Sequence, residues 1–499
     1  MFKVRKLPIH AGINIAVLNP KDARKLGVNV SDRILIKKED ISRVAVVDFD
    51  ATGSIIKEGE VGIFHDIEEF SDGERVEILP YSLPESVRYI RKKQRGLELT
   101  EYEIKKVVED VYYDRLLPIE IASYLTAIQA VGMSINEIIS LTKAMVEIGK
   151  QIEWPKDWIV VDKHSIGGIP NNRTTPIVVP IVAALGLKIP KTSSRAITSP
   201  AGTADVIEVL APVEFDIDEI KEIVSKVNGC MVWGGALDIS PVDDKLIRIE
   251  RSLGLDPEGQ VVASVLSKKK AMGSKYVIID IPYGEHAKVK TLDKAELMAF
   301  KFKKVGESLG MKIKAVITNG FQPIGNGVGP VLEIIDLLKI LRNERDAPKD
   351  LKEKGVELAG KLLELVGRGD YNTARAVLES GKAFEKFKEI IEEQGGSVDR
   401  DLYSMLGQYT YDVVSPVDGY VEKIINTYVA QAARLLGAPE YKGVGLYLFK
   451  KVGYKVKKGE KLLRIYATSE SKLDLVLDYL KSNFPYIIRS RMKFIINEI

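Results

Sequence analysis

The residues best suited to do chemistry in this sequence lie between Val161 and Gly168, where the chain reads VDKHSIGG. An apolar strand is predicted to run into a glycine-rich turn that carries Lys163, His164 and Ser165, and a helix is expected to follow. Backbone N–H groups, a hydroxyl and an ammonium would then face one point, as a phosphate ion requires. The Gly-Lys-Ser/Thr order of a Walker A loop is absent. An ordinary strand-to-helix turn is the alternative, but the chemistry of these residues favours phosphate.

A second polar segment spans Ser193 to Glu208 and reads SSRAITSPAGTADVIE. It follows another predicted strand, and its hydroxyls and small residues suit it to wrap a polar sugar phosphate. Two of its residues also have simpler explanations. Thr203 precedes a predicted helix and fits the N-cap position, and Arg195 could be a surface cation.

These two segments resemble the signature segments of the thymidine and pyrimidine-nucleoside phosphorylases, which read DKHS-x-GG and S-G-R followed by GGT-x-D-x-[LIV]-E. ASVLSKK, with Ser264 and Lys268, resembles the base-reading helix of that family. VIIDIPYGEHAKVKT, with Lys288, resembles the strand and loop that close its site. The resemblance runs from about residue 86 to the C-terminus, and the agreement of four ordered segments makes it specific.

The resemblance implies a phosphate site and a nucleotide site. The phosphate-binding residues that it implies are Lys163, Ser165 and Ser193. The implied nucleotide-binding residues are Gly168, Ser194, Arg195, Ala196, Ile197, Thr198, Ser199, Thr203, Ser264 and Lys288. Arg195 and Lys288 are both candidates to hold a 5′-phosphate, and for Lys288 a plain surface position is an equal alternative.

Departures from the pyrimidine pattern point to one branch of the family. Leu237, in GALD, stands where pyrimidine enzymes carry a base-reading arginine, and Ser199 stands at a family histidine position. With the additional N-terminal segment, these features resemble the archaeal AMP phosphorylases, which act on nucleoside 5′-monophosphates. In the implied reaction, phosphate displaces adenine from AMP to give free adenine and ribose 1,5-bisphosphate. The reaction would serve nucleotide salvage and degradation, with CMP and UMP as further substrates. A phosphorylase of unphosphorylated pyrimidine nucleosides or thymidine, or a related phosphoribosyltransferase, is the first alternative, and a non-enzymatic scaffold is the second.

The leaving base needs a proton, because adenine departs with developing negative charge unless a ring nitrogen is protonated. Asp256 lies in the segment that replaces the pyrimidine reader, about two helical turns before Ser264. We therefore expect Asp256 to be the catalytic proton donor. Because Pro257 follows it, Asp256 is equally suited to be a helix N-cap, and the two roles are compatible.

Four domains must position these residues, so the predicted fold class is multi-domain α/β. Residues 1–85 read as short strands with turns, and LNPKDARKLGVNVSDRILI resembles the repeat unit of double-psi β-barrels, which predicts an N-terminal β-barrel-like domain for oligomerisation. A small helical domain is expected over 86–155, with part of 230–275, and capping boxes begin helices after Thr100 and Ser134. Alternating strands and helices over 156–410 predict a central α/β domain with a sheet that binds phosphate and nucleotide. Residues 411–499 predict a C-terminal α+β, barrel-like domain.

Composition excludes several other functions. The 499 residues include 73 basic and 70 acidic side chains, a net charge of +3 without the basic excess of a nucleic-acid binder. Cys230 is the sole cysteine, no histidines stand at metal-ligand spacing, and no apolar run could cross a membrane. A cytoplasmic enzyme without metal or cofactor is expected, with phosphate as co-substrate. The family resemblance further implies a homodimer that assembles into a larger homo-oligomer.

Overall fold

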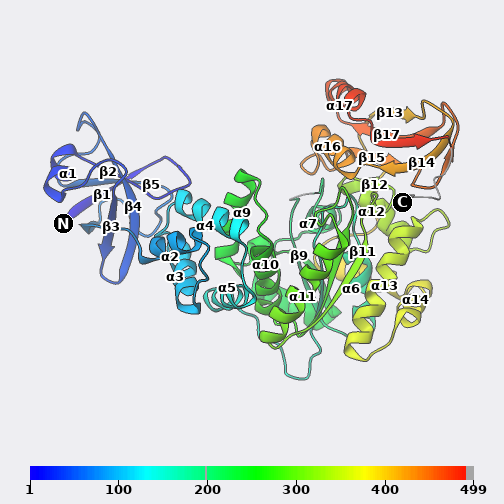
Figure 1. Ribbon diagram of the computed structural model, residues 1–499, viewed down its shortest axis with the longest axis horizontal. Helices are drawn as coiled ribbons and strands as arrows, with labels where there is room; N and C mark the ends of the chain where they lie inside the picture. Colours follow the sequence, from blue (N-terminus) through cyan, green and yellow to red (C-terminus); the bar gives the residue numbers. More distant parts are fainter. Residues whose placement is uncertain (197–198, 491–499) are drawn as a thin grey trace. The chain divides into compact units, whose positions relative to one another are not determined.

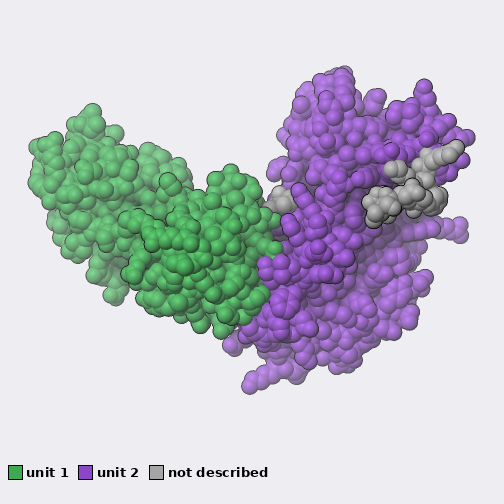
Figure 2. All heavy atoms as spheres, viewed as in Figure 1, with its two compact units in different colours: residues 1–149, 240–264 green, residues 150–239, 265–499 purple. Residues whose placement is uncertain are grey.

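The computed structural model describes residues 1–196 and 199–490 of the chain (Figure 1). Ile197 and Thr198, both predicted to bind nucleotide, lie outside the described residues. The chain divides into two compact units (Figure 2). Unit 1 comprises Met1–Gly149 and Ser240–Ser264, and unit 2 comprises Lys150–Ile239 and Val265–Ile499. The four domain boundaries expected from the sequence stay predictions.

The N-terminal strands of unit 1 close into a barrel in the order β1-β5-β2-β4-β3-β6. The barrel elements are β1 (Phe2–Leu7), β2 (Ile15–Leu18), α1 (Pro20–Leu26), β3 (Arg33–Lys38), β4 (Ile41–Phe49), β5 (Glu60–Phe64) and β6 (Arg75–Pro80). Alternate side chains of these strands fill the interior, as period-two patterning requires. Asn19 caps α1 by accepting from the backbone N–H of Lys21, and Pro20 occupies the first turn.

Helices make up the rest of unit 1. They are α2 (Glu85–Gln94), α3 (Glu101–Tyr112), α4 (Pro118–Val131), α5 (Ile135–Ile148) and α9 (Pro241–Leu253), and α10 (Glu258–Ala271) is divided between the two units. Both predicted capping boxes are confirmed, at the starts of α3 and α5. The box glutamate of α5, Glu137, is buried and also pairs with Lys93 at 2.7 Å. Arg33 of the barrel pairs with Glu120 of α4 at 2.6 Å, which ties the barrel to the helices.

Two parallel sheets, in the orders β11-β10-β7 and β8-β9, lie side by side at the centre of unit 2. Their strands are β7 (Val161–Ser165), β8 (Ile189–Ser193), β9 (Gly229–Trp233), β10 (Tyr276–Tyr283) and β11 (Lys312–Asn319). A parallel bridge between Val160 and Lys188 joins β7 to β8. From β7 the chain proceeds to β8 and β9 on one side and later to β10 and β11 on the other, so the strand order reverses at β7.

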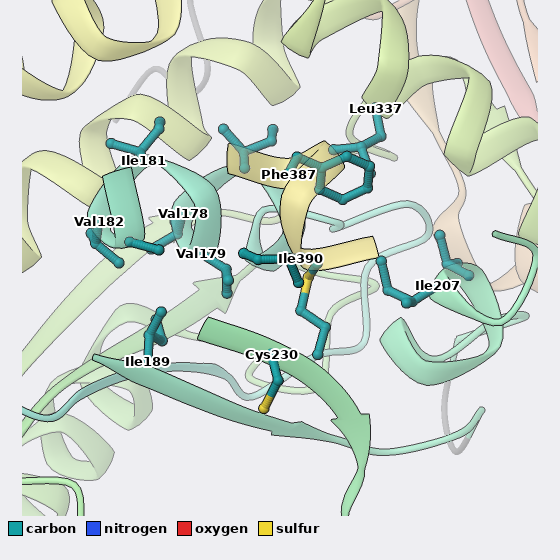
Figure 3. Packing of buried hydrophobic residues seen from close by; sticks show 14 of the residues in the cluster. Val178, Val179, Ile181, Val182, Ile189, Ile207, Cys230, Leu337, Phe387 and Ile390 are labelled. Carbon is teal, nitrogen blue, oxygen red and sulfur yellow. The ribbon is translucent and has the colours of Figure 1, made fainter. Parts of the chain in front are cut away.

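Helices pack around these sheets and bury their apolar strands. They are α6 (Thr175–Ala184), α7 (Thr203–Ile207), α8 (Ile217–Val227), η1 (Gly234–Ala236), α11 (Leu292–Ser308), α12 (Pro330–Leu341), α13 (Lys349–Val366), α14 (Tyr371–Glu379) and α15 (Lys382–Glu393). Figure 3 shows Val179 of α6, Phe387 and Ile390 of α15, and strand residues Ile189 and Cys230 gathered in one interior. The carboxyl ends of the strands are thereby fixed against a rigid core.

The C-terminal part of unit 2 contains two sheets, in the orders β12-β15-β17-β13 and β16-β14-β18. Their elements are β12 (Gly327–Val328), β13 (Tyr409–Val414), β14 (Gly419–Ile424), α16 (Asn426–Leu436), β15 (Gly445–Leu448), β16 (Lys455–Val456), β17 (Lys461–Ala467), α17 (Glu470–Ser482) and β18 (Tyr486–Arg489). Helices α16 and α17 lie beside these strands (Figure 1). Among the described residues, every helix is too short or too polar to cross a membrane.

Candidate phosphate and nucleotide site

Three of the predicted segments follow neighbouring strands of these parallel sheets. Ser165 ends β7, Ser193 ends β8, and Tyr283 ends β10, which precedes the loop that carries Lys288. In open α/β sheets, ligands bind outside the carboxyl ends of the strands at the point where strand order reverses. That point is β7 here, so the topology brings the predicted phosphate turn, the 193–203 loop and the Lys288 loop to one edge.

The side chains of Lys163 and Ser165 lie on one face of β7, as residues two apart on a strand do. The Lys163 ammonium is fully buried and donates to the Thr174 hydroxyl at 2.6 Å. Burial lowers the pKa of Lys163 to about 8, with Asp280 acting in the opposite direction. Ser165 donates its hydroxyl proton to Asp280 Oδ2 at 2.8 Å. A buried ammonium and two hydroxyls thus meet at the end of β7.

Asp280, on β10, is the acceptor around which this face is organised. Its Oδ1 accepts from the Thr318 hydroxyl at 2.6 Å, and its Oδ2 accepts from the Asn172 side-chain amide at 3.2 Å. Lys354 and Lys163 lie 3.2 and 3.9 Å from the same Oδ2. Burial alone would raise the pKa of Asp280, but the two lysines and the hydroxyls bring it to about 2. The carboxylate is therefore ionised and holds two cations beside Ser165.

The opposite face of β7 carries Asp162 and His164. Asp162 pairs with two buried lysines, Lys269 at 2.7 Å and Lys191 at 3.3 Å. Burial and these lysines hold the pKa of His164 well below its usual range, so the imidazole is neutral at pH 7. The strand end is consequently flanked by buried cations on both faces, which suits an anion.

Glycines let the β7 turn approach its neighbour closely. Gly167 and Gly168 have φ of 82° and 87°, in the left-handed region that favours glycine. A Cβ atom on Gly168 would lie 2.7 Å from the backbone nitrogen of Lys288. Gly168 and Lys288, which the sequence predicts to bind nucleotide, are therefore in direct contact.

Asp205 and Arg173 fix the conformation of the 193–203 loop, which is predicted to bind nucleotide and is called the nucleotide loop below. The Asp205 carboxylate accepts from the backbone N–H groups of Ala196 at 2.7 Å and Gly202 at 2.8 Å. Gly202 itself lies so close to the backbone of Ser194 that a Cβ atom would be 2.3 Å from its carbonyl oxygen. The two ends of the loop are thus pinned together.

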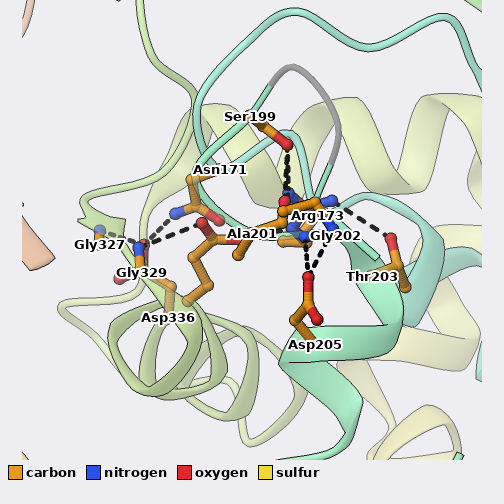
Figure 4. Close-up of polar contacts among 12 residues, drawn as sticks. Asn171, Arg173, Ser199, Ala201, Gly202, Thr203, Asp205, Gly327, Gly329 and Asp336 are labelled. Carbon is orange, nitrogen blue, oxygen red and sulfur yellow. Dashed lines mark hydrogen bonds and ion pairs between the residues drawn. The ribbon is translucent and has the colours of Figure 1, made fainter. Parts of the chain in front are cut away.

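Arg173 reaches into the same loop from the segment that precedes α6 (Figure 4). Its guanidinium donates to the hydroxyls of Thr203 at 3.2 Å and Ser199 at 3.3 Å, and to the carbonyl oxygen of Ala201. Buried Glu333 pairs with the same guanidinium. Both predicted hydroxyls are therefore oriented by one buried arginine, which the sequence reasoning missed.

Ser193 is arranged differently from the other predicted hydroxyls. Its Oγ is buried and has no hydrogen-bond partner among the described residues. A buried hydroxyl without a partner is costly and is expected to acquire one when a ligand binds. This orphaned hydroxyl fits the predicted contact with phosphate.

Arg195 lies among carboxylates. It makes a bidentate pair with Glu208, at 2.7 and 2.9 Å, and further pairs with Glu214 at 2.9 Å and Asp205 at 3.4 Å. Its guanidinium also stacks 4.8 Å from the centre of the Trp233 ring. In this arrangement Arg195 braces the loop, and its role toward a 5′-phosphate stays a prediction.

The C-terminal elements contact the same region. Lys442 pairs with Glu208 at 2.6 Å, so this carboxylate joins the nucleotide loop to the α16–β15 connection. Arg434 of α16 donates to the carbonyl oxygen of Ser199 at 3.4 Å.

Asp256 and Ser264 belong to unit 1. Ser264 donates to the buried Asp243 carboxylate at 2.8 Å, which orients its hydroxyl. Asp256 is exposed, and its backbone N–H donates to the side chain of Gln129 at 3.1 Å. At the start of α10 the backbone N–H of Val261 donates to the carbonyl oxygen of Pro257 at 3.0 Å. Because α10 begins at Glu258, Pro257 and not Asp256 directly precedes the helix, one residue later than the sequence predicted.

Leu237, which stands where pyrimidine enzymes carry a base-reading arginine, is an interior residue. Its side chain is buried in the hydrophobic core of unit 2. An interior leucine cannot supply the hydrogen bonds of a base-reading arginine, which agrees with the interpretation that the pyrimidine-reading residue is absent here.

Sequence reasoning also missed Thr174, Asp280 and Lys354. Asp280 had a signal, since it is a lone charge inside the apolar run YVIIDI. Lys354 had one as well, because it lies three residues after Leu351 and four before Leu358, on the buried face of α13. In the described parts of the chain, no group of three or more His, Cys, Asp or Glu side chains could hold a metal ion.

Family comparisons agree with this architecture. Residues 87–149 match the helical bundle domain of the glycosyl transferase family, and residues 157–384 match its a/b domain. Residues 420–486 match the pyrimidine nucleoside phosphorylase C-terminal domain.

Curated relatives match nearly the whole chain. The AMP phosphorylase of Thermococcus kodakarensis is 46% identical over 491 residues, covering 97% of both chains. The AMP phosphorylase of Natronomonas pharaonis is 44% identical over 95% of both chains. AMP phosphorylase 1 of Archaeoglobus fulgidus is 42% identical, over 98% of this chain and 97% of its own. The chain belongs to the glycosyl transferase family and, within it, to the family of these AMP phosphorylases. This confirms the resemblance seen in the sequence.

Solved structures share the fold. Anthranilate phosphoribosyltransferase from Thermus thermophilus superimposes with a TM-score of 0.52 at 18% identity, over 62% of this chain and 99% of its own. Anthranilate phosphoribosyltransferase from Saccharomyces cerevisiae superimposes with a TM-score of 0.52 at 16% identity, over 63% of this chain and 99% of its own. At these identities the likeness concerns the fold alone.

Proposed function

We propose that this protein catalyses the reversible phosphorolysis of AMP, giving adenine and ribose 1,5-bisphosphate in nucleotide salvage and degradation. CMP and UMP are further proposed substrates. The observation that carries the proposal is the full-length similarity to AMP phosphorylases, at 41–46% identity. The convergence of the phosphate turn, the nucleotide loop and Lys288 at β7, where the strand order reverses, supports the same chemistry.

In this reaction a phosphate oxygen forms a bond to C1′ of the ribose while the bond from C1′ to the base breaks. The transition state resembles a sugar cation, so the protein must chiefly hold phosphate and ribose in line and stabilise charge. Lys163, Ser165 and Ser193 are the proposed phosphate ligands. The buried cations around β7 favour the anion, and the orphaned Ser193 hydroxyl gains an acceptor when phosphate binds.

The nucleotide is proposed to lie along residues 194–199 and Thr203, with Gly168 and Lys288 beside it. Asp205 and Arg173 pre-organise this loop, so little ordering is needed on binding. Lys288 is the better candidate for the 5′-phosphate, because the carboxylates around Arg195 oppose the approach of another anion.

The base leaves with electrons from the broken bond and needs a proton. Asp256 is the proposed donor and recovers its proton from solvent after the base departs. Ser264, oriented by Asp243, is proposed to contact the base.

Three further assignments belong to the proposal. Phosphate is the nucleophile, so the chemistry calls for no cofactor or metal. AMP, other nucleoside monophosphates and phosphate are the proposed partners, without nucleic acid or membrane, and the protein is proposed to work in the cytoplasm. Self-association into a homodimer and a larger homo-oligomer stays a prediction from the family resemblance.

A panel of substrates tests the proposed function. The protein is incubated with phosphate and AMP, CMP, UMP, adenosine or thymidine, and free base is measured by chromatography. Base from AMP but not from adenosine supports the proposal. Base from nucleosides alone would instead indicate a nucleoside phosphorylase, and no base from any of them would indicate a scaffold without activity.

A further inference from the structure

A lysine stands on the buried face of α13. Lys354 shares this face with Leu351 and Leu358, and its side chain is 10% exposed. Its ammonium lies 3.2 Å from Asp280 Oδ2 but makes no hydrogen bond to any described residue. The helix therefore carries a charged group into an interior where a leucine would pack at lower cost.

The ion pair with Asp280 does not fully balance the charges around this ammonium. Asp280 already accepts from Thr318, Ser165 and Asn172, and Lys163 lies close to the same oxygen as Lys354. One carboxylate thus faces two buried ammonium groups, which leaves a surplus of positive charge beside Ser165. An ammonium group has three N–H donors, and one ion pair with a shared carboxylate oxygen leaves donors that a ligand can satisfy.

A phosphate ion supplies what is missing. Lys354 and Ser165 contact one oxygen of Asp280, so the lysine is a close neighbour of a predicted phosphate ligand. Phosphate oxygens are strong acceptors, and their charge would balance the second ammonium.

We propose that Lys354 is a phosphate-binding residue of this protein, which supplies from α13 a second cation beside Lys163. The inference rests on the proposed phosphorolysis for its ligand, inorganic phosphate. It assigns to α13 a role in binding that neither the signature motifs nor their spacing contains. A lysine that served only as counterion to Asp280 would act on stability and would not respond to phosphate.

Lys354→Met removes the charge and keeps the length of the side chain. We expect the Kd for inorganic phosphate, measured by calorimetry in the absence of nucleotide, to rise roughly ten- to a hundredfold. The KM for phosphate should rise similarly, whereas the KM for AMP should change less than about threefold. Lys349→Met, at an exposed position of the same helix, is the matched control and should leave both constants unchanged.

Two results would overturn the inference: an unchanged phosphate Kd in folded Lys354→Met, or equal losses for phosphate and AMP with a lowered Tm. If that variant does not fold, a crystal structure of the wild-type protein with phosphate decides. A phosphate oxygen within hydrogen-bond distance of Lys354 Nζ supports the inference, and a phosphate bound away from Lys354 refutes it. Phosphate binding without turnover of AMP would refute the proposed function and leave this test intact.

Discussion

Gly168 and Lys288 touch through their backbones, although 120 residues separate them in the sequence: a Cβ atom on Gly168 would lie 2.7 Å from the Lys288 nitrogen and 2.9 Å from its Cβ. The contact joins the phosphate turn after β7 to the loop after β10. The position of one loop therefore sets the position of the other. A substitution at Gly168 should accordingly weaken the binding of both AMP and phosphate.

Gly168→Ala tests this coupling. The added methyl group must displace the Lys288 loop, and the left-handed backbone adds a strain of about 1–3 kcal/mol. We expect the KM values for AMP and for phosphate to rise together, each by at least about tenfold. Gly186→Ala, at a left-handed glycine with open space around it, controls for backbone strain alone. Equal kinetics for the two variants would show that the contact is unimportant.

The binding of phosphate should weaken as pH rises through the pKa of Lys163. Burial lowers that pKa to about 8, so the ammonium is charged below pH 8 and loses its proton above it. We expect kcat/KM for phosphate to fall between pH 7.5 and 9.5, by about tenfold per unit beyond the pKa. The Lys163→Gln variant should have a low kcat/KM for phosphate, and this value should not fall between pH 7.5 and 9.5. A wild-type profile that stays level across the same range would exclude Lys163 as the titrating phosphate ligand.

Arg173 should matter for both stability and nucleotide binding. Arg173→Met leaves Glu333 buried without its partner, which is expected to lower the free energy of unfolding by about 3–5 kcal/mol. The double variant Arg173→Met/Glu333→Leu should recover much of that loss but not the affinity for AMP, because the 199–203 loop remains unanchored. Denaturant unfolding and AMP titration measure the two effects. Full recovery of AMP affinity in the double variant would contradict the anchoring role.

The roles of Lys288 and Arg195 can be distinguished by comparing the binding of AMP with the binding of phosphate in single variants. Lys288→Met should raise the KM for AMP roughly ten- to a hundredfold without altering the Kd of phosphate. Arg195→Met should weaken AMP binding to the same extent as Glu208→Gln, since both substitutions break the ion pair between Arg195 and Glu208 and loosen the nucleotide loop. Should Arg195→Met alone weaken AMP binding while Glu208→Gln has no effect, Arg195 would be the 5′-phosphate ligand instead.

Asp256→Asn tests the proton donor. The amide cannot supply a proton to the leaving base, so kcat should fall by about 10²–10⁴-fold while the Kd for AMP changes little. Asp244→Asn, on α9, is a control carboxylate. Unchanged turnover in Asp256→Asn would remove Asp256 from the mechanism.

Local signals in the sequence were sufficient to predict the secondary-structure elements and the positions of the loops between them. The apolar runs before Ser165 and Ser193 predicted β7 and β8, and both capping boxes were present as expected. These signals are local because a strand, a turn or a cap depends on residues that are neighbours in the chain.

The partners of those loops depend on tertiary contacts. Arg173 and Asp205 orient the nucleotide loop, and Asp280 orients Ser165 across a strand pair. The sequence shows that such residues are polar but not which loop they meet. The burial of Leu237 likewise follows from tertiary packing and is not visible in the sequence beside the motif.

The central claim is that phosphate, rather than water, displaces the base from a nucleoside monophosphate. Phosphorus NMR of AMP with inorganic phosphate and the protein measures this directly. We predict that one inorganic phosphate disappears for each adenine released and that the product carries both a sugar 1-phosphate and a 5-phosphate signal. Ribose 5-phosphate formed with no loss of inorganic phosphate would contradict the account.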